Sequence, residues 1–439
     1  MNSELIEKVS ITYTRRPHIL LPIVICVCIA FLLFVTIFIM LSPSQIHPYL
    51  CTHINVAFAV VSNKEIALDI LQRHYLTEIV KLKIINPNLK ILLSIGGAGD
   101  DDGFSDMVVD HASRKIFIKS IKSILRNYSL DGVDIDWEFP ALHKNKTGHS
   151  RERQHFSQLL REIRAEYARE KRDYVLTVAV AAPETIADVS YDVDQLNMYV
   201  DFVNIMTYDF HSYTKYTPLT GLNSPVYAGP TEQTFLATLN INYTVHMYIS
   251  KGLDRNKIVV GIPTYGHSFS LQNKKNTGIS SPASGYGCLG DMGFVNYPII
   301  CTFISDHKCE VTIKEDEIAK VPYLYRNTEW VSYDNPKSVM EKAKYIKENG
   351  LRGAMIYSLN ADDFEGVCEE SLNRAIHFPL SKSVREALAV HKMDNDIKPF
   401  HECEEVYLLF FGHISDFVHG TIFHDIETDG YKDISVGFG

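Results

Sequence analysis

The amino-acid sequence predicts an α/β fold, a (β/α)8 barrel of the TIM type with one transmembrane helix in front of it. After residue 50, short apolar runs alternate with amphipathic stretches of helical period, as in a parallel sheet covered by helices. About seven such units, without a G-x-G-x-x-G or phosphate-loop motif, favour a closed barrel over an open sheet. The expected strands are 54–61, 90–95, 132–137, 175–181, 202–207, 258–263 and 353–357, and the expected helices include 114–126, 151–171, 233–251 and 336–348.

Two segments interrupt this alternation. The stretch from Pro263 to Tyr357 is too long for one loop and one helix, and it contains Gly, Ser and Pro clusters with apolar and aromatic runs of its own. We therefore expect a small inserted domain at 266–340. After about residue 380 the alternation stops, and the apolar run 406–411 in the tail 381–439 is too short to cross a membrane. The sequence predicts no role for this tail.

The composition allows a large core and argues against nucleic acid as a partner. The chain has 439 residues, 46% of them hydrophobic, and a formal net charge of -10 without a long basic run. This length accommodates one large barrel or two ordinary domains. A nucleic-acid-binding chain would instead carry a basic patch.

An uncharged segment near the N-terminus predicts a membrane anchor. Residues 19–41 contain no charged side chain, and about 23 residues at ~1.5 Å each can cross a ~30 Å hydrocarbon core. The alternative is a cleaved signal peptide, but the apolar run is longer than such peptides have and ends without a clear cleavage site. Lys8, Arg15 and Arg16 precede the span, so we expect a cytoplasmic tail at 1–18 and a type II topology with a lumenal or extracellular domain.

The residues beyond the span fit an oxidising compartment. Three N-x-S/T sequons begin at Asn127, Asn145 and Asn242 and are candidate glycosylation sites. Six cysteines follow the span, and their spacing matches no zinc site. Spacing alone leaves their disulfide connectivity open.

Three acidic residues at alternate positions in an apolar strand predict a catalytic centre. Asp134, Asp136 and Glu138 would share one face of the strand, with Val133, Ile135 and Trp137 on the other. Mutual repulsion and desolvation raise the pKa of at least one such carboxyl group, which then stays protonated near neutral pH. Acid catalysis, with glycoside hydrolysis foremost, is the chemistry expected. Asp131 lies off this register and is expected to be a turn residue.

The segment 131–140 resembles the D-G-x-D-x-D-W-E signature of glycoside hydrolase family 18, the chitinases and chitinase-like proteins. Further pieces match in order: C-T-H-I-N-V-A-F-A at 51–59, S-I-G-G at 94–97, M-T-Y-D at 206–209, T-G-L-N-S-P at 220–225, G-I-P-T-Y-G at 261–266, V-P-Y at 321–323, W-V-S-Y-D at 330–334, G-A-M at 353–355 and D-D at 362–363. The resemblance covers about 51–380. The anchor resembles that of membrane-anchored chitinase-like proteins of invertebrates.

The resemblance implies a barrel with a small α+β insertion, which cleaves chitin or N-acetylglucosamine oligosaccharides by substrate-assisted retention. Glu138 would protonate the glycosidic oxygen, and the acetamido oxygen of the substrate would attack the anomeric carbon. Asp136 would stabilise the charged acetamido group, Asp134 would support Asp136, and Tyr208 would hold the acetamido oxygen. No cofactor or metal is implied.

The resemblance also implies the rest of the sugar pocket, three cis peptides and one disulfide. The cis peptides are expected at Ala57-Phe58, Glu138-Phe139 and Tyr357-Ser358, and the disulfide between Cys301 and Cys368. A pairing of Cys288 with Cys309 is only a guess. The expected substrate-binding residues are Phe58, Gly96, Gly97, Trp137, Phe139, Met206, Asp209, Tyr265 and Tyr357. For Tyr265 a core role is an equal alternative, and for the two glycines the alternative is a requirement of the turn after a strand.

The sequence departs from the family at its start. Only about ten residues separate Leu41 from Cys51, which leaves no room for the first strand of the family. We therefore expect a barrel that lacks this strand, a Cys51 without its usual partner, and unpaired sheet edges unless another segment fills the gap. Tyr357 also replaces a usual Trp, and His267 a frequent Arg. These departures leave two alternatives to the enzyme open: a non-catalytic lectin for N-acetylglucosamine glycans, and a shortened chain that does not fold stably.

Overall fold

The structure is a computed structural model, and it describes residues 41–99, 102–142, 151–230, 232–368, 376–389 and 405–411. The predicted cytoplasmic tail and all but the last residue of the predicted span at 19–41 lie outside the described residues. Among the residues described, no helix is long and apolar enough to cross a membrane. The anchor therefore stays a prediction.

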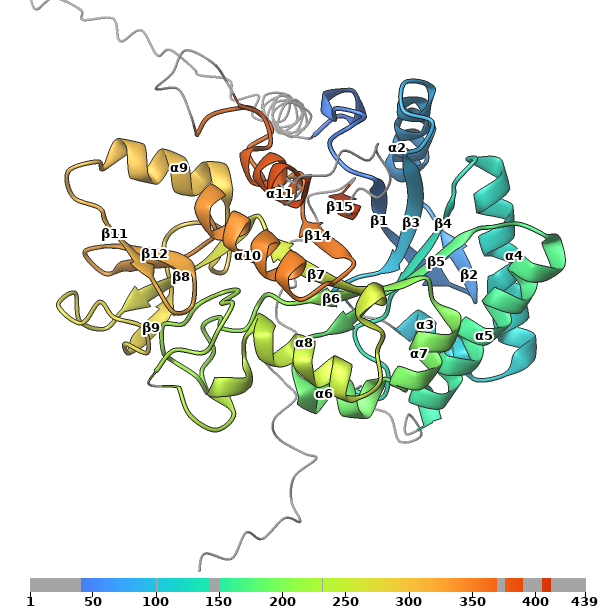
Figure 1. The fold of residues 1–439 in the computed structure, drawn as a ribbon, viewed down its shortest axis with the longest axis horizontal. Helices are drawn as coiled ribbons and strands as arrows, with labels where there is room; N and C mark the ends of the chain where they lie inside the picture. Colours follow the sequence, from blue (N-terminus) through green and yellow to red (C-terminus); the bar gives the residue numbers. More distant parts are fainter. Residues whose placement is uncertain are drawn as a thin grey trace, which may run out of the picture. The chain divides into compact units, whose positions relative to one another are not determined.

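A parallel barrel, the architecture predicted from the alternation of strands and helices, forms the body of the molecule (Figure 1), and its ring of strands is closed. Within the part of the chain that the structure describes, the neighbours in the sheet follow the order β15, β14, β7, β6, β5, β4, β3 and β1, and β15 pairs again with β1. The short strand β2 (Glu65–Ala67) is attached antiparallel to β1 outside this ring. The barrel strands are β1 (His53–Ser62), β3 (Lys90–Gly96), β4 (Gly132–Asp136), β5 (Val175–Ala181), β6 (Phe202–Met206), β7 (Ile258–Pro263), β14 (Gly353–Tyr357) and β15 (Glu405–Phe411).

The C-terminal tail supplies the strand that the sequence leaves missing, which corrects the expectation of a barrel without its first strand. β15 lies between β14 and β1 and is parallel to both. His53 lies opposite Tyr407, and Gly353 lies opposite Glu405. Without this strand, β14 and β1 would each expose a row of unpaired N-H and C=O groups. The apolar run 406–411, to which the sequence assigned no role, thus closes the barrel.

The alternation of strands and helices also continues beyond residue 380. Helix α11 (Pro379–Ala389) follows β14, contacts α10 and β14, and precedes β15. This order is the strand-helix-strand unit that joins parallel neighbours elsewhere in the barrel.

The helices lie mainly where their apolar periodicity predicts them. One expected helix, 233–251, is shorter, because Asn240 is extended and its side chain accepts a hydrogen bond from the backbone N-H of Tyr243, which starts the helix there. The helices are α2 (Ile70–Ile79), α3 (Asp102–Val108), α4 (His111–Asn127), α5 (Glu152–Glu170), α6 (Glu184–Ser190), α7 (Val193–Tyr199), α8 (Ile241–Ser250), α9 (Tyr297–Asp306), α10 (Pro336–Glu348) and α11, with short 3-10 turns η1 (Pro43–Gln45), η2 (Val80–Ile84), η4 (Leu236–Thr238) and η5 (Arg255–Lys257).

A second, antiparallel sheet occupies the region where the sequence predicts an insertion (Figure 1). Its core holds Phe269 and Trp330 in edge-to-face contact, with ring centroids 5.4 Å apart. The sheet and helix α9 together make it an α+β unit. Its strands are β8 (Tyr265–Leu271), β9 (Ala283–Tyr286), β10 (Phe294–Asn296), β11 (Thr312–Asp316), β12 (Val321–Arg326) and β13 (Glu329–Ser332).

One of the disulfide expectations is confirmed. Cys301 of α9 is bonded to Cys368, which follows β14, with Cα atoms 5.1 Å apart. The guess of a pairing between Cys288 and Cys309 is wrong, because both are exposed free thiols. Cys51 is a buried free thiol.

A pair of truncations tests whether β15 closes the barrel. Truncation after residue 411 keeps β15, and truncation after residue 404 removes it. We expect the shorter chain to lose at least about 3 kcal/mol of unfolding free energy relative to the longer one, because hydrogen bonds along two strands are lost. Urea unfolding followed by circular dichroism measures this difference. Equal midpoints for the two truncated chains would contradict the closure of the barrel by β15.

Candidate active site

The carboxylates of β4 lie inside the barrel, where the strand alternation places them. Asp134 and Asp136 are buried, with 1% and 2% of their surface exposed. Asp134 accepts hydrogen bonds from side chains of β3, β5 and β6: from Ser94 Oγ at 2.8 Å, Thr177 Oγ1 at 2.5 Å and Asn204 Nδ2 at 3.0 Å. Burial raises the pKa of Asp134, and these three donors oppose that rise. Asp134 is therefore held in one place at the base of the pocket.

Glu138 combines access with a raised proton affinity. It follows the end of β4 and keeps part of its surface exposed, so a ligand in the barrel mouth can reach it. Burial, and next to it the negative charge of Asp209, raise the pKa of Glu138 to about 8. A carboxyl group with this pKa is protonated at neutral pH, as a general acid must be.

Trp137 lies on the other face of β4, which corrects its expected role as a substrate-binding residue. Its ring stacks on Phe104 of α3 with centroids 5.3 Å apart and meets Phe156 of α5 edge-on at 5.8 Å. No part of Trp137 is exposed. Since successive side chains of a strand point to opposite faces, a residue beside Asp136 and Glu138 must face the helices.

An aromatic cluster forms the wall beside the carboxylates. Tyr208, which follows β6, stacks on Tyr357 at the end of β14, with ring centroids 5.3 Å apart and planes at 27°. Burial, followed by the charges and phenols nearby, raises the pKa of Tyr208, so it stays a neutral hydrogen-bond donor. Tyr357 is partly exposed, and Met206 packs against the buried cluster that contains Tyr208. This arrangement offers an apolar surface next to a phenol, as a sugar ring with an acetamido group requires.

Tyr265 and His267 both contact Asp209. The Tyr265 hydroxyl donates to Asp209 Oδ1 at 2.6 Å, and His267 Nε2 lies 2.7 Å from the same oxygen. Tyr265 is 1% exposed, and its ring stacks on Phe294 at 4.1 Å. It therefore takes the core role of the two that the sequence allowed, and it orients Asp209 instead of presenting its ring to a ligand.

Nearby atoms of the same chain leave no room for a side chain at Gly96, the last residue of β3, or at Gly97 after it. Gly96 has φ +114°, and a Cβ there would lie 2.0 Å from the carbonyl oxygen of Asp136. Gly97 has φ +85°, and its Cβ would lie 2.6 Å from the ring of Phe58. The Gly97 N-H donates to Asp136 O at 2.8 Å, which joins the ends of β3 and β4. The structure therefore requires glycine at positions 96 and 97 for the turn itself. Contact of these glycines with a substrate stays a prediction.

The three expected cis peptides are present, at Ala57-Phe58, Glu138-Phe139 and Tyr357-Ser358. Phe58 and Phe139 are each 7% exposed. The Glu138-Phe139 peptide follows β4 and the Tyr357-Ser358 peptide ends β14, at the carboxyl end of the sheet where barrel enzymes carry their active sites, whereas Ala57-Phe58 lies within β1.

Asp131 has the structural role expected of it. Its carboxylate accepts the Ile91 N-H at 2.8 Å and pairs with Lys83 Nζ at 2.7 Å. It stands before β4, at the end of the barrel opposite Glu138. It therefore joins the beginnings of β3 and β4 and takes no part in the pocket.

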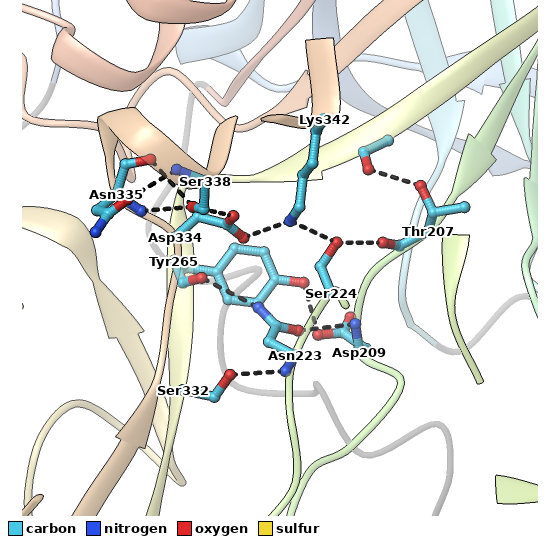
Figure 2. Close-up of polar contacts among 11 residues, drawn as sticks. Thr207, Asp209, Asn223, Ser224, Tyr265, Ser332, Asp334, Asn335, Ser338 and Lys342 are labelled. Carbon is cyan, nitrogen blue, oxygen red and sulfur yellow. Dashed lines mark hydrogen bonds and ion pairs between the residues drawn. The ribbon is translucent and has the colours of Figure 1, made fainter. Parts of the chain in front are cut away.

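Asn223 is a residue of the site to which the sequence assigned no role (Figure 2). Its side-chain oxygen accepts the Asp209 N-H at 2.9 Å, and its side-chain nitrogen donates to the Tyr265 carbonyl at 3.1 Å. The match of 220–225 to a family motif was the available signal, but the contact joins three segments that are separate in the sequence.

Comparisons with known proteins agree with this geometry. The model of glycosyl hydrolases family 18 matches residues 35–362. Mouse chitotriosidase-1 is 35% identical over 79% of this chain and 74% of its own, and human chitinase-3-like protein 2 is 36% identical over 79% and 87%.

Solved structures give the same result. A group IV chitinase from Ostrinia furnacalis, in complex with allosamidin, superposes with a TM-score of 0.73 at 33% identity over 80% of this chain and 94% of its own. Human YKL-39, described as a pseudo-chitinase with retained chitooligosaccharide binding, has the same TM-score at 35% identity over 80% and 94%. With its barrel, its D-G-x-D-x-D-W-E strand and a family match over most of its length, this chain belongs to glycosyl hydrolase family 18.

Proposed function

We propose that the protein is a membrane-anchored glycosidase that cleaves β-1,4-linked N-acetylglucosamine polymers with substrate-assisted retention. The observation that carries the proposal is Glu138, a carboxyl group open to the barrel mouth with a pKa raised to about 8. A protein that only binds sugar has no need for a group that is protonated at neutral pH beside two further carboxylates.

The residues around Glu138 supply the other parts of the mechanism. Glu138 donates its proton to the glycosidic oxygen while the acetamido oxygen of the substrate attacks the anomeric carbon. The glycosidic bond breaks, the leaving sugar departs with the new hydroxyl group, and an oxazolinium ion forms. Asp136, buried two residues after Asp134 on β4, stabilises the positive charge that develops on the acetamido group. The neutral phenol of Tyr208 donates to the acetamido oxygen. Water then opens the oxazolinium ion, and Glu138 accepts its proton.

A chitooligosaccharide-binding lectin is the second candidate. Its support is the similarity to human YKL-39, whose TM-score equals that of the Ostrinia chitinase. The partly exposed Tyr357 would then be a sugar platform without turnover.

We also propose type II insertion, with the barrel in the lumen or outside the cell. The uncharged segment 19–41 and the basic residues before it support this orientation. The sequons differ in their surroundings. Asn127 is exposed, whereas Asn242 is partly buried and accepts the Tyr345 hydroxyl at 3.2 Å. Asn145 lies outside the described residues.

Replacing the proton donor separates the two candidates. Glu138→Gln keeps the shape of the side chain but removes the transferable proton. We expect hydrolysis of an N-acetylglucosamine tetramer to fall by about 10²- to 10⁴-fold, with tetramer binding retained. Kinetics and calorimetry measure the two quantities. Binding by the wild-type protein without any turnover would support the lectin.

The pH dependence tests the cause of the raised pKa. Asp209→Asn removes a negative charge that raises the pKa of Glu138, so Glu138 should lose its proton at a lower pH. We expect the alkaline limb of the kcat/KM profile to move to lower pH in the variant. An unchanged limb would show that Asp209 does not contribute to the proton affinity of Glu138.

Protease protection tests the topology. In microsomes that carry the full chain, the barrel should be protected from added protease, and the tail 1–18 should be accessible. An endoglycosidase should shift the mobility of the wild-type chain, and Asn127→Gln should reduce that shift more than Asn242→Gln does, because Asn127 is the more exposed. A barrel digested in intact microsomes would rule out the proposed orientation.

A further inference from the structure

We propose that Lys342, paired with Asp334, is a positioning residue for the sugar pocket and holds the turn 207–210 through the hydroxyl group of Ser224. The turn contains Tyr208 and Asp209. This inference rests on the proposed function, because it gives these two residues their task.

Lys342 forms a buried ion pair between the insertion and the barrel. It lies on α10, and its Nζ is 2.7 Å from Asp334 Oδ2 just after β13. Lys342 is fully buried, and Asp334 is 2% exposed. Ser338 adds a hydrogen bond to Asp334 Oδ1 at 2.6 Å. Since apolar residues often replace such a pair without loss of stability, stability alone gives little reason for it.

The ammonium group fixes the direction of a neighbouring hydroxyl (Figure 2). Lys342 Nζ donates to Ser224 Oγ at 2.9 Å, and it cannot accept a hydrogen bond. Ser224 must therefore direct its own hydrogen elsewhere, and it donates to the Thr207 carbonyl at 2.7 Å. Thr207 Oγ1 in turn donates to the Gly261 carbonyl of β7 at 2.6 Å. The charge thereby holds the peptide that directly precedes Tyr208.

Asn223 holds the other side of the same turn. Its side-chain oxygen accepts the Asp209 N-H at 2.9 Å, and its carbonyl accepts the Phe210 N-H at 3.1 Å. Its own N-H donates to Ser332 Oγ at 2.8 Å. Residues 223 and 224 thus clamp the turn before Tyr208 and after it. Asp209 has φ +57°, a conformation uncommon for a residue other than glycine, so the turn depends on these contacts.

The clamp links the buried pair to two functions of the pocket. Tyr208 lies against Tyr357, where the acetamido group of the substrate would bind. The Asp209 carboxylate raises the pKa of Glu138. Loosening the turn should therefore weaken the hold on the acetamido group and reduce the proton affinity of the acid together.

Three variants of the full chain test the proposal. Lys342→Met/Asp334→Leu removes both charges and leaves no buried unpaired ion. Ser224→Ala removes only the hydroxyl relay. The control is Arg114→Met on α4, which breaks a different buried pair, with Glu162 of α5 at 2.8 Å. We expect both Lys342→Met/Asp334→Leu and Ser224→Ala to reduce kcat/KM, and the double variant to reduce it on the order of 10²-fold. In both variants the alkaline limb of the kcat/KM profile should move to lower pH. The control should lower only the melting temperature.

A second measurement keeps this test separate from the proposed function. Hydrogen exchange at the Asp209 and Phe210 amides should accelerate in the double variant and in Ser224→Ala, and stay at the wild-type rate in Arg114→Met. A wild-type protein without binding or turnover would overturn the proposed function, while the exchange rates would still decide on the clamp. The role of Lys342 would be overturned if both the double variant and Ser224→Ala kept wild-type exchange rates and an unmoved alkaline limb of the kcat/KM profile.

Discussion

Closure of the parallel barrel is the constraint on which the rest of the structure depends. A parallel strand satisfies its backbone groups only between two neighbours, and the position between β14 and β1 is filled by β15 from the C-terminal tail. Both strands that flank β15 contribute to the candidate site: β14 ends at Tyr357, and β1 contains the Ala57-Phe58 peptide. The closure of the ring and the wall of the pocket therefore depend on the same strands. The barrel is thus closed by the pairing of two segments that lie far apart in the sequence, β1 and β15.

Inside the closed ring, polar side chains from the adjacent strands β3, β4, β5 and β6 meet around one carboxylate. Ser94, Asp134, Thr177 and Asn204 bring three donors to one buried carboxylate. Asp136 and Glu138 follow Asp134 at alternate positions of the chain, on the same face as this hydrogen-bonded carboxylate. Burial, and after it the negative charge of Asp209, raise the pKa of Glu138 to about 8, so this carboxyl group is protonated at neutral pH. The turn that carries Asp209 is hydrogen-bonded by Asn223, and Tyr265 and His267 of β8 contact the Asp209 carboxylate. The second sheet therefore places two side chains beside the charge that raises the pKa of Glu138.

The sequence predicts features that neighbouring residues encode, and it does not predict contacts between segments that are distant in the chain. Strand alternation separated Asp136 and Glu138 from Trp137 correctly when it was read from the residues alone, whereas assigning Trp137 to the pocket by resemblance was wrong. The role of β15 could not be predicted, because its apolar run is short and its partners lie some 350 and 50 residues away, a pairing that leaves no local pattern. The same holds for the contacts of Asn223, Ser224 and Lys342, which join segments that only the folded barrel brings together. Cys301 and Cys368, by contrast, were paired by resemblance, and the pairing is confirmed.

Hydrogen exchange at β15 tests the closed barrel most directly. If Glu405–Phe411 lies between β14 and β1, its backbone amides should be protected to a degree comparable with those of β4. On unfolding, β15, β14 and β4 should lose their protection together. Mass spectrometry of peptides that cover 405–411, 353–357 and 132–136 measures this in the intact chain. Amides in 405–411 that exchange at the rate of an unstructured peptide, while β4 stays protected, would contradict the account.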